Sequence, residues 1–224
     1  AADCPWPALA TLDAGSWHAR ELALPAARRQ AFLRTLGEAE LARHLPAAER
    51  LRLAAGDIRI PTLAEVLALA RRCDLMLNIE IKSIPRLYEG VAAAVVERVR
   101  AAGLARSVLV SSFDHEQLLA LRALDDEIAT GVLTGERLAR PADYLRLLDA
   151  DAYHPCCHGE GDSLGFGSVS GRLDTRGIDQ VRAAGGMVFV WTCNDPVQME
   201  ALCRAGVSGI ITDYPNRFPF AADG

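Results

Sequence analysis

The sequence lacks the features that direct a protein to a membrane or to a nucleic acid. No segment approaches the ~20 uninterrupted apolar residues that a bilayer-spanning helix needs, and the first residues contain no charged-then-apolar leader. There is no long Lys/Arg run, and the net charge of -5 disfavours partners that attract cationic surfaces. We therefore expect a soluble protein that acts on a small molecule, with no nucleic-acid partner and no membrane insertion.

The six cysteines include no C-x-x-C pair, which argues against a zinc ribbon or a thiol redox motif. A chain of 224 residues, half of them apolar, can build a core without disulfides. We expect reduced thiols, a cytoplasmic location and a single domain over residues 1–224.

From residue 61 onward, short β-branched runs alternate with helical stretches. This alternation is typical of parallel βαβ units and predicts an α/β fold. The predicted strands are Leu75–Lys82, Ser107–Phe113, Ile128–Leu133, Ala152–His154, Met187–Cys193 and Gly209–Asp213.

Capping boxes and glycines mark where the intervening helices begin and end. A side-chain acceptor followed three residues later by Glu or Gln satisfies the first free amides of a helix. The boxes are Thr62-x-x-Glu65, Asp114-x-x-Gln117 and Asp195-Pro196-x-Gln198, and the predicted stops are Gly103, Gly185 and Gly206.

Residues 20–56 interrupt this rhythm. They are rich in Ala, Leu, Arg and Glu, show helical periodicity and contain no strand pattern. We interpret them as a helical insertion. Their arginines could contact a partner, but a solvated helix surface is the simpler explanation.

The predicted strand Leu75–Lys82 has one polar face. Because side chains alternate along a strand, Asn78, Glu80 and Lys82 share a face, and three apolar side chains share the other. Two charges inside a closed parallel barrel would be costly unless they lay at its catalytic mouth. The alternative is a half-exposed edge strand with a surface Glu and Lys, since alternation is common there.

A carboxylate beside an ammonium group suits phosphate chemistry. The carboxylate can hold a hard divalent cation through oxygen, and the ammonium can neutralise a phosphate oxygen. One carboxylate is too few to hold a metal ion alone.

Three further positions could serve either function or structure. The run His154-Pro155-Cys156-Cys157-His158 holds four potential soft-metal ligands in five residues. Adjacent cysteines surround a zinc ion poorly, so we interpret them as loop thiols. His154 could contact a substrate or be a hydrogen-bonded structural histidine. Asp213, which precedes Tyr-Pro, is interpreted as capping a turn.

Several motifs together carry a family resemblance. LNIEIK, VLVSSFD, VFVWTCNDP and GVSGIITDYP, with LDAGSW and IPTLAEVL, are similar to bacterial, cytoplasmic-type glycerophosphodiester phosphodiesterases, in order from Leu12 to Pro215. The resemblance implies a TIM (β/α)8 barrel of lipid and glycerol metabolism that hydrolyses glycerophosphodiesters to glycerol phosphate and an alcohol.

The resemblance also implies roles for individual residues. Glu80 would be a ligand of Mg²⁺ or Ca²⁺, and Lys82 a catalytic residue that contacts the phosphate. Phe113 and Trp191 would line the glycerol side of the substrate, although Trp191 could equally be core packing. His154 is added to them as a candidate substrate contact at the end of its strand.

The sequence departs from the family pattern at its start. The family's His-Arg, Glu-x-Asp and His-Asp motifs do not precede LDAGSW, and six rather than eight strands are identifiable. We expect about 50 to 70 further residues upstream, carrying these motifs, to complete such a barrel. The alternative is a truncated, non-catalytic barrel that acts as a binding or structural module.

Overall fold

The computed structural model describes residues 4–83, 88–157 and 175–219, which fall into two compact units. The first unit is Ala1–Thr62 and the second is Leu63–Gly224. None of the helices in the described ranges is both long and apolar enough to cross a bilayer.

The first unit is built from short helices. Arg29 is buried, and its guanidinium donates to the carbonyl oxygens of Leu22, Leu24 and Leu36, which satisfies backbone acceptors between the helices. The helical character predicted for residues 20–56 is confirmed, and their interpretation as an insertion stays a prediction. The elements are α1 (Trp6–Leu9), α2 (Ser16–Leu22), two 3-10 turns (Ala26–Arg28 and Ala31–Leu33), α3 (Glu38–His44) and α4 (Ala47–Ala54).

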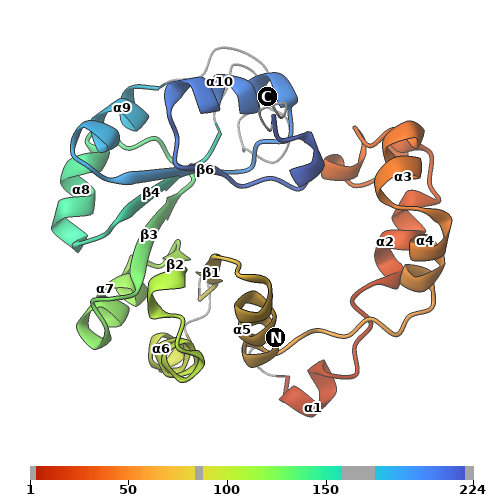
Figure 1. Ribbon diagram of the computed structural model, residues 1–224, viewed down its shortest axis with the longest axis horizontal. Helices are drawn as coiled ribbons and strands as arrows, with labels where there is room; N and C mark the ends of the chain where they lie inside the picture. The colour runs from red at the N-terminus through yellow and green to blue at the C-terminus, as the bar shows by residue number, and fades with distance from the viewer. Residues whose placement is uncertain (1–3, 84–87, 158–174, 220–224) are drawn as a thin grey trace. The chain divides into compact units, whose positions relative to one another are not determined.

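The second unit is a six-stranded parallel sheet in which every strand pairs with the next one along the chain. Figure 1 shows the sheet curling, with the connecting helices on its convex side. This curled half-barrel confirms the predicted α/β class and the barrel-like arrangement. The strands are β1 (Leu77–Ile81), β2 (Val108–Ser112), β3 (Ala129–Thr134), β4 (Ala152–Pro155), β5 (Met187–Val190) and β6 (Gly209–Ile210).

The helices cover the convex face of this sheet with apolar side chains. Ile81 on β1 packs in one cluster with Val95 and Val99 of α6 and Leu67 of α5. A second cluster joins β3, β4 and β5 to the later helices. The helices are α5 (Leu63–Cys73), α6 (Val91–Ala102), α7 (His115–Leu124), α8 (Pro141–Leu148), α9 (Arg176–Ala183) and α10 (Pro196–Ala205).

The predicted helix ends are confirmed in part. Asp195 caps α10 by accepting from the amides of Val197 and Gln198, and α6 and α10 end at the left-handed residues Gly103 and Gly206. α7 begins directly after Asp114, as predicted, but the Asp114 side chain accepts from no backbone amide of that helix. Its carboxylate accepts instead from Ser83, across the neighbouring strand.

Candidate functional site

Three of the predicted site residues, Glu80, Lys82 and Phe113, lie near the carboxyl ends of β1 and β2. Ile81 pairs with Ser112, so Lys82 and Phe113 follow directly at the ends of neighbouring strands, and Glu80 lies opposite Ser111. Ile81 packs on the helices, which directs Glu80 and Lys82 to the other face. This is the end of a parallel barrel at which active sites lie.

Glu80 and Lys82 form an ion pair. The Lys82 Nζ lies 2.5 Å from Glu80 Oε1, and the two side chains are 75% and 29% exposed respectively. β1 is also an edge strand of the described sheet. The strand therefore has both the polar face and the edge position that the sequence analysis considered. An ion pair this exposed stabilises a fold by about 0 to 1 kcal/mol.

Lys82 is also distinctive in its residue type. It is the only lysine in the sequence, and the other 23 of the 24 basic residues are arginines. A lysine ammonium is a compact point charge, whereas the arginine guanidinium is a planar fork. Position 82 therefore carries a cation of different shape from every other basic side chain in the chain.

Phe113 and Trp191 meet beside the charged pair. Their rings stand edge to face with centroids 5.4 Å apart, and Phe113 is 40% exposed. The indole Nε1 of Trp191 donates to the carbonyl oxygen of His154 at 2.8 Å. Trp191 is half-buried rather than a core residue, so the two predicted aromatic residues form one partly open wall.

His154 lies behind this wall. Its side chain is fully buried, its ring packs 5.0 Å from that of Phe189, and its Nε2 occupies the space beside Gly131. Neither ring nitrogen has a hydrogen-bond partner in the described structure, so the hydrogen-bonded structural histidine is not observed. Burial lowers the pKa of His154 to about 4, and the ring is therefore neutral at pH 7.

Cys156 and Cys157, which follow β4, do not form a metal site with the other described residues. The Cys157 thiol contacts Gln198 Oε1 at 3.6 Å and the Cys193 thiol, and this contact with burial raises the pKa of Cys157. No three His, Cys, Asp or Glu side chains of the described ranges converge as metal ligands. His158 lies outside those ranges.

Asp213 ties two loops together at the end of β6. Its Oδ2 accepts from Asn194 Nδ2 at 2.8 Å, while the amide of Tyr214 donates to Thr212 Oγ1 at 3.0 Å. Thr212 therefore caps the turn that we predicted Asp213 to cap.

A divalent cation could use Glu80 as one ligand. Its carboxylate is a hard oxygen donor on the concave face, which is the chemistry that Mg²⁺ and Ca²⁺ require. Among the described residues, Lys82 donates to Glu80 at its Oε1. The described residues supply no complete set of metal ligands around it. Glu80 therefore fits a divalent cation as one ligand of several.

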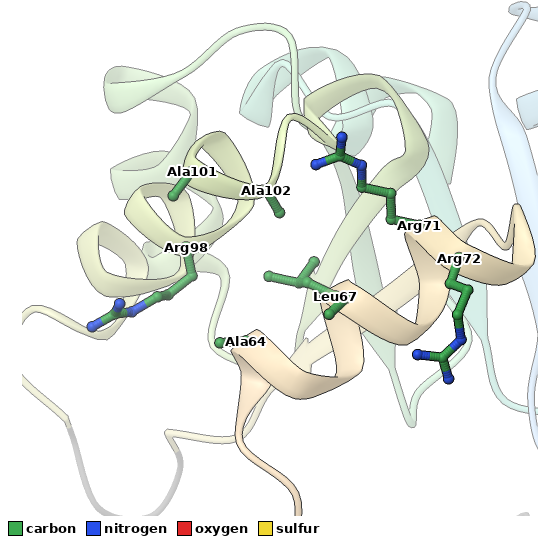
Figure 2. Close-up of a pocket in the computed structure, with 8 residues that line it drawn as sticks. Ala64, Leu67, Arg71, Arg72, Arg98, Ala101 and Ala102 are labelled. Carbon is green, nitrogen blue, oxygen red and sulfur yellow. The ribbon is translucent and has the colours of Figure 1, made fainter.

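A hollow of about 560 Å³ between α5 and α6 lies on the helix-covered side of the sheet. Leu67 and alanines form its floor, and Arg71, Arg72 and Arg98 stand around it. Figure 2 shows that the three guanidinium groups point in different directions. They do not converge on one anion, and the hollow is separate from the concave face that carries Glu80 and Lys82.

Sequence reasoning missed the polar contacts that join the ends of β1 and β2. Ser83, Ser112 and Asp114 are all buried, and Ser83 Oγ donates to Asp114 Oδ2 at 2.7 Å. The SSFD run was visible, but the contact spans 31 positions and depends on the register of two strands. The local sequence indicated only that Asp114, next to Phe113, could begin a helix.

Comparison with known proteins places this geometry in a family. The profile of the Glycerophosphoryl diester phosphodiesterase family matches residues 2–217. A glycerophosphodiester phosphodiesterase of Bacillus altitudinis is 32% identical over 163 residues, 72% of this chain. One from Caldanaerobacter subterraneus subsp. tengcongensis is 30% identical over 157 residues, 70% of this chain. The chain spans 62% and 59% of these two relatives.

A solved structure supports the fold. The phosphodiesterase of Oleispira antarctica, in complex with the product sn-glycerol-3-phosphate, superposes with a TM-score of 0.58 at 24% identity. The match covers 76% of this chain and 63% of that one.

Proposed function

The chain belongs to the glycerophosphoryl diester phosphodiesterase family, and we propose that it hydrolyses glycerophosphodiesters to glycerol phosphate and an alcohol with the help of a divalent cation. The observation that carries the proposal is the Glu80–Lys82 pair, 2.5 Å apart at the carboxyl end of β1. It lies one strand from the aromatic wall of Phe113 and Trp191. Curated relatives that are named for this activity support it.

Each residue contributes through its chemistry. The Lys82 ammonium neutralises a non-bridging phosphate oxygen as negative charge builds up in the transition state. Glu80, bonded to Lys82, orients that ammonium and offers its remaining lone pairs to Mg²⁺ or Ca²⁺. When bound, such a cation would polarise the phosphate.

The aromatic wall would hold the glycerol moiety. Phe113 and Trp191 present partly exposed ring surface that can pack on the carbon atoms of glycerol and exclude water. The direct substrate contact predicted for His154 stays a prediction. The His154 carbonyl supports a second role, because it holds the Trp191 indole in place.

The experiment is hydrolysis of glycerophosphocholine followed by ³¹P NMR, with Mg²⁺ or Ca²⁺ and with a chelator. We expect turnover to need the cation and to fall when Glu80 is replaced by Gln. The matched control is Glu127→Gln, which removes a carboxylate from the Arg106–Glu127 ion pair before β3. Undiminished turnover by Glu80→Gln in excess chelator would contradict the proposal. A folded protein without turnover would favour the non-catalytic binding module.

A further inference from the structure

The ends of β1 and β2 are joined by side chains that flank two of the proposed site residues. Ile81, Lys82 and Ser83 run beside Ser112, Phe113 and Asp114, because Ile81 pairs with Ser112. Lys82 and Phe113 are the middle residues of these two stretches. The residues on either side of each are bonded to the opposite stretch.

Two hydrogen bonds cross between the stretches, and a third lies within the second stretch. Ser112 Oγ donates to the carbonyl oxygen of Ile81 at 2.7 Å and accepts from the amide of Asp114 at 3.0 Å. Ser83 Oγ donates to Asp114 Oδ2 at 2.7 Å. The backbone of Lys82 is thus held on both sides, at Ile81 and at Ser83.

The connection is buried. Ser83, Ser112 and Asp114 are 1%, 0% and 8% exposed, whereas the Lys82 side chain that they flank is 75% exposed. Hydrogen bonds to a carboxylate are about twice as strong as those between neutral groups, and they gain further in a low-dielectric interior. The exposed Lys82 side chain is therefore attached to a backbone that buried hydrogen bonds flank on both sides.

The sequence would assign Asp114 a different task. It precedes α7 as Asp195 precedes α10, but only the Asp195 carboxylate accepts from backbone amides of its own helix. The Asp114 Oδ2 accepts hydrogen bonds from Ser83 Oγ at 2.7 Å and from Gln117 Nε2 at 3.3 Å. Forgoing the helix cap would be unfavourable unless the link to β1 compensated for it.

We propose that Asp114, with Ser83 and Ser112, is a positioning residue that fixes Lys82 and Phe113 relative to each other, so that the ammonium and the aromatic wall address one substrate. The proposal rests on the proposed function for the identity of that substrate. The three residues act through the backbone, and none of them touches the reacting atoms.

The test uses the single lysine. Protein labelled with [¹⁵N]lysine gives one lysine amide signal, which reports Lys82. We expect its order parameter to be about 0.85 in the parent protein and to fall below about 0.6 in Asp114→Ala and in Ser83→Ala. Asp114→Asn keeps an oxygen acceptor for Ser83 and should retain the parent value.

Asp195→Ala is the matched control, since it removes a helix-start carboxylate that accepts from backbone amides of its own helix. It should lower the thermal midpoint without changing the Lys82 order parameter. If Asp114→Ala behaves like Asp195→Ala on both measurements, Asp114 is only a helix start and the proposal is overturned. If Asp114→Ala does not fold, Ser83→Ala, which deletes one hydroxyl, decides by the same criterion.

A titration with sn-glycerol 3-phosphate, followed at the same signal, separates this proposal from the proposed function. We expect the dissociation constant to rise about 10-fold in Asp114→Ala, because misplaced binding groups lose much of their effect, and to change less than about 3-fold in Asp114→Asn. If the parent protein does not bind the ligand, the proposed function fails, while the order parameters still decide whether Asp114 positions Lys82.

Discussion

Lys82 provides the most direct test at the scale of single residues. We expect Lys82→Ala to lower the rate of phosphodiester hydrolysis by about 10²-fold, since it removes a charge aimed at the transition state. Its exposed ion pair with Glu80 should cost less than about 1 kcal/mol of stability. Lys82→Arg, which keeps the charge but changes its shape, is the matched control and should recover only part of the rate. A large loss of thermal stability with an unchanged rate per folded molecule would make Lys82 a structural residue.

His154 makes a prediction about pH. Its pKa is lowered by burial from 6.5 to about 4, so the unfolded chain binds a proton in a range where the folded protein does not. Above pH 6.5 the ring is neutral in both states, so it does not lower the free energy of unfolding. As the pH falls from 6.5 to about 4, the ring gains a proton in the unfolded chain alone, and the free energy of unfolding falls by about 3 kcal/mol in total.

The variant His154→Leu isolates this effect. Because both ring nitrogens lack partners in the described structure, replacing the ring with an apolar side chain should leave stability at pH 7 nearly unchanged or increase it. Urea denaturation of the variant and of the parent protein, at pH 7 and at pH 4.5, measures the free energy of unfolding and its pH dependence. An equal pH dependence in the variant and the parent protein would show that other groups are responsible.

At the scale of single elements, Gly131 on β3 and His154 on β4 share one space. A Cβ atom on residue 131 would lie 2.6 Å from His154 Nε2 and 2.9 Å from Leu109 Cδ2. We expect Gly131→Ala to destabilise the protein by about 1 to 3 kcal/mol, as overpacking does. It should also disturb the His154 ring.

Gly135→Ala is the control for this prediction. Gly135 follows the same strand, and nothing lies within 4 Å of its Cβ position. Thermal unfolding of the two variants compares them directly. A Gly131→Ala protein as stable as Gly135→Ala would show that the sheet accommodates the methyl group.

The strands and helices were largely predictable because their signals are local. Alternation in LNIEI and the capping box at Asp195 are read from neighbouring residues, and both are confirmed. The helix start at Asp114 was predicted as well, but the bond of its carboxylate to Ser83 was not, because the pairing of β1 with β2 brings Ser83 to it. Likewise, the burial of His154 depends on the absence of a side chain at Gly131, on another strand.

At the scale of the whole molecule, the predicted parallel order of six strands is confirmed, and the family assignment agrees with the resemblance inferred from linked motifs. The site is predictable to the extent that it lies on this sheet. Glu80, Lys82, Phe113 and Trp191 come from three strand ends that the βαβ rhythm places at one edge. Their roles depend on a ligand, which a sequence pattern does not contain.

The measurement that tests the central claim most directly is the response of the Lys82 side chain to phosphate. With [¹³C,¹⁵N]lysine, the only lysine of the chain gives one set of side-chain NMR signals. We predict a saturable shift of these signals with sn-glycerol 3-phosphate and no comparable shift with glycerol. Unchanged Lys82 signals in the folded protein at millimolar sn-glycerol 3-phosphate would contradict the assignment of this strand end as the phosphate-binding site.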